Sequence, residues 1–390
     1  MEQVTAYAVG SGHTHFGRLD ALSLEDLIVR AGSEAIQDAG IDARDIDAVF
    51  LGHFNAGMVS DAFASSLAHQ IHADLRFTPA VRCENACASG AAALSAALSA
   101  IRAGEVDIAL VIGVEKMTHN STAQVTQALA GAGYQQDTQE SALSFPQVFG
   151  IAAQQYTERY QSPLGPMAQI AAKNHANALH NPLAQMQRSI TFEQCNAVSE
   201  RNPLIAAPLR LTDCSLVSDG AAAVVLCSAP KAREFATKVA LRSLVHVSDF
   251  LPMSRRDFLA FEGPQKAISQ ALLKAGLTLG DLSFAEVHDC FTIAELLIYE
   301  AMGLAAPGQG HRALDEGTVF REGRLPVNVS GGLKAKGHPV GATGVSMHAL
   351  SYRQLTGQAG AMQLPNPEFA LVFNMGGAAV ANYASILQAV

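Results

Sequence analysis

The stretch Cys83-Glu84-Asn85-Ala86-Cys87-Ala88-Ser89-Gly90 runs directly into a segment of very small residues that extends to Ile101. Leu94, Leu98 and Ile101 follow the i, i+4, i+7 spacing that predicts an apolar stripe on a helix. Cys87 is therefore expected at a helix N-terminus. Free backbone N–H groups and the positive end of the helix dipole favour a thiolate there and stabilise an oxyanion beside the sulfur. The alternative is a small buried cysteine with no chemical role.

Strand-like and helix-like segments alternate along the chain on both sides of this helix. Short apolar runs predict buried strands, and longer amphipathic runs predict helices. Gly40 and Gly104 each follow a predicted helix, as C-terminal caps often do. The alternation predicts an α/β protein with a largely parallel sheet. The expected strands are 5–10, 46–52, 106–113, 218–227 and 284–287, and the other expected helices are 24–39, 145–159, 167–178 and 292–302.

The chain also carries an internal repeat. Its 390 residues exceed what one hydrophobic core usually supports, so two domains or a duplicated fold are expected. Three segments of the first half find counterparts in the same order in the second half, which favours duplication over the common pattern of α/β units. The pairs are Ala39–Ile46 with Ala275–Leu282, Val106–Gly113 with Glu368–Phe373, and Ala221–Ser228 with Ala379–Leu387.

The composition limits the partners and the compartment. A formal net charge of -9 argues against a nucleic-acid or membrane-surface protein. No run of roughly 18 apolar residues predicts a membrane span, and the N-terminus lacks the features of a signal peptide. The cysteines are dispersed without paired metal-ligand spacing, which predicts a reducing cytoplasm and no metal site. Cys195, Cys214 and Cys227 are interpreted as ordinary core or loop residues.

Three polar or glycine-rich clusters occupy strand ends or turns in the second half: His288-Asp289-Cys290-Phe291, Asn328–Gly344 and Asn374–Ala379. Loops beyond the strand ends are where open α/β sheets bind ligands. In the second cluster, glycines let backbone N–H groups approach a ligand, and His338 is held rigidly between a glycine and a proline. A plain tight turn with an incidental histidine is the alternative. Lys334 and Lys336 are interpreted as a solvated basic edge.

Together these motifs resemble those of the thiolase family over essentially the whole chain, from His13–Arg18 to the terminal glycine motif. The segment Gly331–Gly344 is similar to the glycine-histidine-proline signature of that family. The motif at 288–291 resembles the sterol-carrier-protein type and its bacterial and archaeal relatives, whereas other thiolases carry Asn-Glu-Ala-Phe there. Those other thiolases also have a reactive cysteine in a Cys-x-Gly motif. This sequence has Asn374 at that position, so Cys290 looks like the substitute acid/base.

The resemblance implies the duplicated five-layered α-β-α-β-α thiolase fold, with buried central helices between two sheets. It implies a first half formed by 1–118 and 213–235, an inserted loop domain at 119–212, and a second half at 236–390. It also implies a homodimer or a dimer of dimers. Some relatives act with a small zinc-containing partner of the OB-fold type, which makes such a partner a further expectation.

The expected substrates are acyl-CoA and CoA, with neither a metal nor a prosthetic group. The resemblance implies thiolytic cleavage of a 3-ketoacyl-CoA or its reverse, a Claisen condensation of thioesters. CoA contacts are expected from the region 115–260, with Arg210, Arg255 and Arg256 as candidates.

The same resemblance assigns the chemistry to five residues. Cys87 is the expected acyl carrier, His338 accepts its proton, and Cys290 exchanges a proton with the α-carbon. His288 and His338 are expected to line one oxyanion site, and the N–H groups of Cys87 and Gly376 the other. A thiol with a pKa of about 8.5 is a poor base at neutral pH, so Cys290 must be tuned by neighbours such as His288.

Two other functions are consistent with a chain of this kind. A lyase relative performs retro-aldol cleavage of CoA-linked steroid side chains, but such proteins lack the nucleophile and the glycine-histidine-proline motif present here. A non-catalytic CoA-binding scaffold would have no reason to keep Cys87, His288, Cys290 and His338 together.

Overall fold

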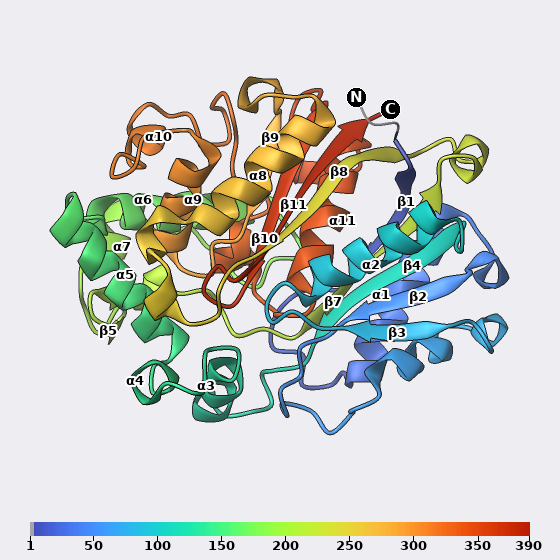
Figure 1. Ribbon diagram of the computed structural model, residues 1–390, viewed down its shortest axis with the longest axis horizontal. Helices are drawn as coiled ribbons and strands as arrows, with labels where there is room; N and C mark the ends of the chain where they lie inside the picture. The colour runs from blue at the N-terminus through green and yellow to red at the C-terminus, as the bar shows by residue number, and fades with distance from the viewer. Residues whose placement is uncertain (1–3) are drawn as a thin grey trace.

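A nine-stranded mixed sheet runs through the computed structural model, which describes residues 4–390 (Figure 1). Its strand order is β3-β2-β4-β7-β1-β8-β11-β10-β9, and β5 and β6 form a separate small hairpin. The strands are β1 (Ala6–His13), β2 (Ala48–Gly52), β3 (Ala80–Cys83), β4 (Ile108–Glu115), β5 (Leu204–Ala206), β6 (Leu209–Arg210), β7 (Gly220–Ser228), β8 (Val239–Ser248), β9 (Phe284–Val287), β10 (Phe369–Gly376) and β11 (Ala381–Ala389).

The strand order is mirrored about the pair β1 and β8. The sequence β2-β4-β7-β1 on one side corresponds to β9-β10-β11-β8 on the other, and this symmetry agrees with the repeat predicted from the sequence. Tyr7 lies opposite Ala240 and Ala8 opposite Val239 in an antiparallel ladder. The strands of the two halves are therefore joined in one continuous sheet rather than separated into two sheets.

Five layers nevertheless form, because the two halves of this sheet face opposite sides of a central pair of helices. Helix α1 (Leu24–Ala39) covers one face of β1, β4 and β7. Helices α2 (Ser89–Ala103) and α11 (Thr343–Leu355) pack on the other face. Helix α11 also contacts β10 and β11, and α8 (Glu262–Ala275) covers β8 and β11 from outside. The predicted thiolase architecture is thus confirmed (Figure 1).

The prediction of a largely parallel sheet is wrong. Within the nine-stranded sheet of residues 4–390, only β2–β3, β2–β4 and β9–β10 are parallel pairs, whereas five neighbouring pairs are antiparallel. Two of these antiparallel pairs, β4–β7 and β10–β11, form because the connection between their strands returns to the sheet where it left it. Glu115 at the end of β4 pairs with Gly220 at the start of β7, and Gly376 pairs with Ala381 across the turn between β10 and β11. Strands joined without a crossover must run antiparallel.

The long excursion between β4 and β7 consists mainly of helices, which gather at one end of the molecule (green in Figure 1). They are α3 (Thr122–Ala130), α4 (Thr138–Ser141), α5 (Phe145–Arg159), α6 (Leu164–Ala178) and α7 (Phe192–Asn196). The second half adds α9 (Thr292–Met302) and α10 (Arg312–Asp315). The division of the chain at 118, 212 and 235 into halves and a loop domain stays a prediction.

Several local signals placed the elements correctly. Helix α1 has the predicted bounds because Ser23 forms a capping box with Asp26 and Gly40 adopts the left-handed C-cap conformation, with φ of 67°. Helices α5 and α9 and strand β9 also match their predicted bounds. Strand β1 continues beyond Gly10 to His13, since it pairs with β7 along this length, and β8 was not predicted.

Helices α2 and α11 cross backbone to backbone at two glycines. A Cβ atom on Gly90 would lie 2.8 Å from the carbonyl oxygen of Gly341, and one on Gly344 would lie 2.4 Å from the nitrogen of Ala91. Glycine is needed for such an approach. The segment Ala86–Ala103 has the length and apolar composition of a membrane span, but half of it is buried inside the structure, where α2 is a core helix. This crossing brings together the chain segments that precede the two helices.

Candidate active site

Cys87, His288 and His338 converge at the start of the two central helices. One sulfur or ring nitrogen from each residue lies within 4.8 Å of the others. The two imidazole rings are 5.1 Å apart between centroids and nearly perpendicular, at 84°. The structure therefore brings three of the predicted site residues into one cluster. A thiol and two imidazoles are also donors that Zn²⁺ accepts, so the same cluster is the candidate metal site of the described residues.

The turn before Cys87 is held in an unusual conformation. Ala86 has φ of 52°, the left-handed region that a non-glycine residue seldom adopts. Ser89 Oγ accepts the backbone N–H of Asn85 at 2.9 Å and donates to the carbonyl oxygen of Ala86 at 2.6 Å. The side-chain amide of Asn85 donates to the hydroxyl of Tyr383 at 2.8 Å. Local strain held by surrounding bonds is a feature of functional sites, and here it fixes Cys87.

Cys87 is a thiol in this resting structure, contrary to the expectation from its place at a helix N-terminus. Burial raises the pKa of Cys87 to about 12, and the Glu115 carboxylate adds to this effect. The N–H groups of Cys87 and Gly377 act in the opposite direction but more weakly. Desolvation outweighs the N–H groups and dipole at the helix start. An acceptor for the thiol proton is therefore required before Cys87 can act as a nucleophile.

His338 has the tautomer of such an acceptor. Its Nδ1 lies 2.7 Å from Thr343 Oγ1, and the hydroxyl of Thr343 donates to the carbonyl oxygen of Pro339 at 3.0 Å. With that hydroxyl hydrogen engaged, Thr343 accepts from Nδ1–H, which leaves a lone pair on Nε2. Burial lowers the pKa of His338 to about 3, with a further contribution from Lys336, so the ring is neutral. Its backbone N–H donates to Ser218 Oγ at 2.9 Å.

His288 has the opposite tautomer. The side-chain nitrogen of Asn374 lies 3.2 Å from the carbonyl oxygen of Cys87, which can only accept, and 2.9 Å from His288 Nδ1. The amide thus donates to both, and the proton of His288 must be on Nε2. Burial lowers the pKa of His288 well below its usual value, and His338 contributes to this shift. His288 is therefore a neutral donor where His338 is a neutral acceptor.

Cys290 lies in the loop after β9 and is buried, with 8% of its surface exposed. Burial raises its pKa well above the usual value, and Cys87 and Asp289 raise it further. The expectation that neighbours such as His288 would tune this thiol toward the thiolate is therefore wrong for the resting structure. The reason is that Cys290 is itself buried and has a second thiol and a carboxyl close by. The carbonyl oxygen of Cys290 accepts the N–H of Ser215 at 2.9 Å, which fixes the loop.

Gly376 places the end of β10 directly against the Cys87 turn. A Cβ atom at this position would lie 2.1 Å from the carbonyl oxygen of Asn85, so no other residue fits without a shift of the backbone. The predicted site residue is thus beside the nucleophile, although its role as an oxyanion donor stays a prediction.

A buried polar network, which was not predicted, lies behind the loop 288–291. Asp289 accepts the N–H groups of Leu333 and Lys334 at 2.6 and 3.1 Å, and the side-chain amide of Asn174 at 2.8 Å. Asn174 also donates to Glu295, which accepts Lys173 Nζ at 2.7 Å. Burial and the nearby Glu295 raise the pKa of Asp289 to about 7. The network ties the loop of His288 and Cys290 to the segment that carries His338.

Lys334 and Lys336 are not a solvated edge. Only 3% and 0% of their surfaces are exposed, because the turn Gly332–Lys336 is covered by the Asp289 loop and by the segment 185–186. Lys334 lines a cavity of about 560 Å³ together with Arg188, Arg201 and Ser215. This cavity lies next to the backbone of Cys290, which Ser215 contacts.

The three arginine candidates for CoA binding differ in their surroundings, and for Arg255 and Arg256 this role stays a prediction. Arg210 is buried and donates to Asp213 at 2.7 Å, so it is a structural residue and unsuited to bind CoA. Arg256 donates to the carbonyl oxygen of Ala378 at 2.8 Å, and Arg255 stacks on Phe250. Cys195 and Cys227 are buried, as interpreted, whereas the half-buried Cys214 lines the cavity.

Comparisons with known proteins agree with this geometry. The model of the thiolase N-terminal domain matches residues 6–230, and the model of the thiolase C-terminal domain-like family matches residues 246–389. The chain belongs to the thiolase family and is an acyltransferase.

Individual relatives indicate the type of thiolase to which the chain is similar. An acetyl-CoA acetyltransferase of Methanothermobacter thermautotrophicus is 39% identical over 372 residues, which cover 95% of each chain. Human sterol carrier protein 2 is 31% identical over 391 residues, which cover 95% of this chain and 69% of that protein. The solved Ltp2-ChsH2(DUF35) aldolase has a TM-score of 0.81 at 22% identity, over 99% of this chain and 98% of that one, a likeness of fold alone. The resemblance to the sterol-carrier-protein type is confirmed.

Proposed function

We propose that the protein transfers acyl groups between CoA thioesters through an acyl-cysteine on Cys87. The reaction is thiolytic cleavage of a 3-ketoacyl-CoA or its reverse, a Claisen condensation. The observation that carries this proposal is the pair of opposite tautomers beside one thiol: His338 presents a lone pair, and His288 presents an N–H. One histidine is thereby suited to accept a proton and the other to stabilise a negative oxygen.

The first half-reaction loads the acyl group. The proton of Cys87 moves to Nε2 of His338 while the sulfur attacks the thioester carbonyl. The resulting oxyanion faces the N–H groups of Cys87 and Gly376. The bond from the carbonyl carbon to the CoA sulfur then breaks, and that sulfur takes the proton from His338. A neutral, buried imidazole returns the proton readily because its protonated form is disfavoured by burial.

The second half-reaction uses Cys290 and His288. In the condensation direction, Cys290 first gives up its thiol proton to solvent. The thiolate then takes a proton from the α-carbon of a second thioester, and Nε2–H of His288 stabilises the enolate oxygen. The new carbon–carbon bond forms as the bond to Cys87 breaks, and the proton gained by Cys290 balances the thiolate released. In the cleavage direction, Cys290 donates a proton to the α-carbon. Its raised pKa favours the thiol form that this donation needs.

The basic cavity of about 560 Å³ is the proposed site for the phosphate-bearing part of CoA. Arg188, Arg201 and Lys334 supply positive charge, and Ser215 connects the cavity to the Cys290 loop. Phosphate groups favour such clusters of guanidinium and ammonium groups. Arg188 and Arg201 lie within the predicted region 115–260, whereas Lys334 comes from the second half.

The proposed assembly is a homodimer joined through β3. This edge strand pairs only with β2 among the described strands, and Val81 on it and Phe77 before it are 48% and 85% exposed. An unpaired apolar edge is self-complementary across a two-fold axis. The protein is expected to sediment as a dimer, and Val81→Lys is expected to shift it toward the monomer. A wild-type monomer, or a dimer that Val81→Lys leaves intact, would contradict this assignment. A small OB-fold partner is a further proposal, supported by the DUF35 subunit named in the aldolase structure.

Two variants test the division of labour between the cysteines. Cys87→Ala is expected to prevent formation of an acyl adduct on exposure to acetyl-CoA, as seen by intact-protein mass spectrometry. Cys290→Ala is expected to keep the adduct on Cys87 but to block condensation and thiolysis. Cys83→Ala is the matched control, because Cys83 is only four positions away and has no assigned role.

Further outcomes separate the alternatives. Full activity of Cys290→Ala would remove its assigned role, and absence of any adduct on the wild-type protein would favour a lyase or a scaffold. Treatment with EDTA is expected to leave the rate unchanged, whereas loss of activity that Zn²⁺ restores would assign the three-residue cluster to a metal.

A further inference from the structure

The cluster of Cys87, His288 and His338 has the donor atoms of a zinc site. A thiolate and two imidazoles bind Zn²⁺ at bond lengths of about 2.0–2.3 Å, which sets tetrahedral donors about 3.3–3.6 Å apart. The three donor atoms of the cluster already lie within 4.8 Å of one another. Side-chain movements of about 1.5 Å or less would therefore bring them to the spacing that zinc requires.

His338 is arranged as a metal ligand would be. A metal-bound histidine donates the hydrogen of its other ring nitrogen to a neighbouring acceptor, which fixes the lone pair that faces the metal. In His338, Nδ1–H donates to Thr343 Oγ1 at 2.7 Å, and the lone pair is on Nε2. A metal ion that displaced the thiol proton of Cys87 would thus find two ligands ready.

His288 is arranged in the opposite way. Its Nδ1 accepts the side-chain amide of Asn374 at 2.9 Å, and its Nε2 carries the hydrogen. Neither ring nitrogen therefore offers a free lone pair. A metal ion could bind His288 only if the hydrogen moved to Nδ1, where it would face the N–H of Asn374. The amide cannot simply turn over, because its oxygen would then face the carbonyl oxygen of Cys87.

The orientation of the Asn374 amide is costly to the protein. Asn374 is fully buried, and its side-chain oxygen has no hydrogen-bond partner among the backbone and side chains of residues 4–390. An unsatisfied buried oxygen destabilises a fold and is uncommon in native proteins. The orientation therefore serves the two hydrogen bonds that the nitrogen donates rather than the needs of the oxygen.

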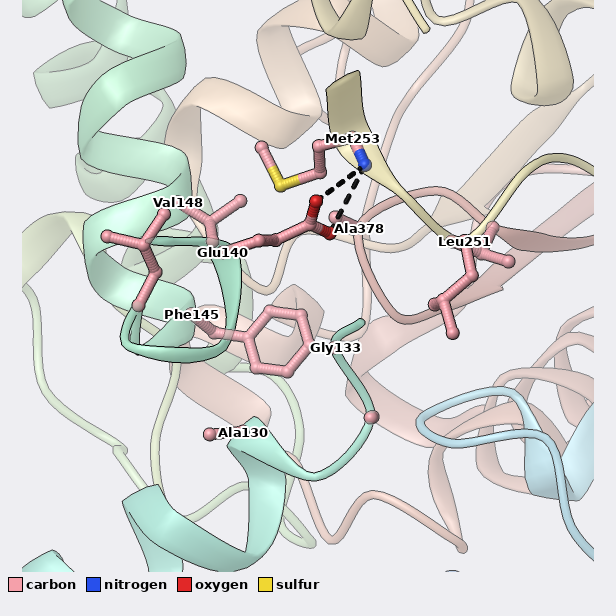
Figure 2. Close-up of a pocket in the computed structure, with 11 residues that line it drawn as sticks. Ala130, Gly133, Glu140, Phe145, Val148, Leu251, Met253 and Ala378 are labelled. Carbon is pink, nitrogen blue, oxygen red and sulfur yellow. Dashed lines mark hydrogen bonds between the residues drawn. The ribbon is translucent and has the colours of Figure 1, made fainter. Parts of the chain in front are cut away.

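The strand end that carries Asn374 is fixed as well. Asn374 lies opposite Tyr383 in the ladder of β10 and β11. In the turn after β10, the carbonyl oxygen of Ala378 accepts from Arg256 at 2.8 Å, and Ala378 lines a small apolar recess together with Leu251 (Figure 2). A substitution at position 374 is thus expected to change the hydrogen bonding of His288 more than the course of the backbone.

We propose that Asn374 is a specificity-determining residue that keeps Zn²⁺ and similar divalent cations out of the cluster of Cys87, His288 and His338, because it holds His288 as a hydrogen-bond donor. A metal ion in the cluster would occupy the sulfur of Cys87. Its exclusion keeps that sulfur free as a nucleophile. This role is additional to acyl transfer and is measured without it.

The test compares the Zn²⁺ affinities of the wild-type protein, Asn374→Asp and Asn374→Ala at pH 7, by competition with a chromophoric chelator. A carboxylate at position 374 accepts Nδ1–H of His288 and leaves the lone pair on Nε2, as in carboxylate–histidine–zinc sites. Asn374→Asp is therefore expected to bind one Zn²⁺ about 10–100-fold more tightly than the wild type. Asn374→Ala removes the amide donor without supplying an acceptor, so its affinity is expected to lie between the two.

Two controls locate the bound metal. Asn366→Asp makes the same change of charge at an exposed position, and its affinity is expected to equal that of the wild type. Adding Cys87→Ala to Asn374→Asp is expected to remove the gain in affinity. Co²⁺ in place of Zn²⁺ should give a thiolate-to-cobalt absorption band in Asn374→Asp, and that band should disappear without Cys87.

Equal Zn²⁺ affinities of the wild-type protein and both variants at position 374 would overturn the proposal. A gain in affinity that persists without Cys87 would overturn it too. If Asn374→Asp does not fold, Asn374→Ala decides, since it must still bind Zn²⁺ more tightly than the wild type. The proposed function is judged separately, by the acetyl adduct on Cys87 of the wild-type protein.

Discussion

The side-chain nitrogen of Asn374 lies 2.9 Å from Nδ1 of His288. The same amide also donates to the carbonyl oxygen of Cys87, which settles its orientation and hence the tautomer of the histidine. Asn374 stands where other thiolases are expected to carry a reactive cysteine. In this chain Asn374 instead orients His288, and the proton transfer to and from the α-carbon is assigned to Cys290.

Asn374→Asp is expected to slow condensation by about 10²-fold or more, the cost of losing one oxyanion donor. A carboxylate only accepts hydrogen bonds, so it would draw the His288 proton to Nδ1 and leave Nε2 without one. Loading of Cys87 should fall much less, which a comparison of adduct formation with product formation measures. In a His288→Ala background, Asn374→Asp should add little; additive losses would show that Asn374 acts by another route.

Thr343→Val is expected to slow the loading of Cys87 by about 10²-fold, within the range of a general base. The variant keeps the shape of the side chain but removes the oxygen that accepts Nδ1–H of His338. Thr343→Ser keeps that oxygen and should retain most of the rate. Single-turnover acylation, measured with the melting temperature of each variant, separates tautomer loss from unfolding. Equal rates for the valine and serine variants would contradict the assignment.

Lys173→Met is expected to lower the free energy of unfolding by about 3–5 kcal/mol, because it leaves Glu295 charged and buried without its partner. The Lys173–Glu295 pair is 2.7 Å apart, and both side chains are at most 1% exposed. Arg312→Ala breaks an ion pair with Glu316 whose side chains are more than half exposed, and it should cost about 0.5 kcal/mol or less. Urea unfolding of both variants gives the comparison. If the two variants lost similar amounts of free energy of unfolding, the buried pair would not matter more than the exposed one.

The stability of the fold is expected to fall as the pH decreases below about 6.5, the ordinary pKa of histidine. Burial lowers the pKa of His338 to about 3 and that of His348 to about 4, and it shifts His13 and His288 in the same direction. Below pH 6.5 the histidines of the unfolded chain thus bind protons, whereas the same buried histidines of the folded chain stay neutral. The stabilisation is complete above this pH and is lost toward pH 3–4.

Each such histidine contributes at most about 1.4 kcal/mol per pH unit. Asp289 acts in the opposite direction, since its raised pKa favours the folded state at lower pH, but it is one group against several. Melting temperatures between pH 8 and pH 5 test the prediction, and His348→Gln should show a shallower decline than the wild type. A melting temperature that stays constant down to pH 5 would refute it.

The elements that the sequence placed well depend on neighbours along the chain. The capping box of Ser23 and the glycine at position 40 are separated from α1 by no more than one turn, so local pattern determined both ends. The cysteine, the two histidines and the glycine of the site were found because each lies in a distinctive motif at an element end. What the site contains was thus predictable, whereas how its members are protonated was not.

The predictions that failed depend on contacts between residues that are far apart in the sequence. Ser218 and His338 are 120 positions apart, and no local pattern links them. The charge of Lys336 is visible in the sequence, but the loops that cover it are not. The same holds for Cys87: a helix start can be recognised from residue spacing, whereas the enclosing residues and the Glu115 carboxylate that raise its pKa come together only after the chain has folded.

The crossing of α2 and α11 at Gly90 and Gly344 aligns two similar strings, Ala88-Ser89-Gly90 and Ala342-Thr343-Gly344. By this correspondence the position of Cys87 in the other repeat is Gly341, whose added Cβ would lie 2.4 Å from the carbonyl oxygen of Val114. Of the two equivalent positions, one thus carries a reactive atom and the other carries no side chain. The glycine lets the second repeat approach closely enough for His338 to lie beside Cys87, so neither repeat alone holds the complete site.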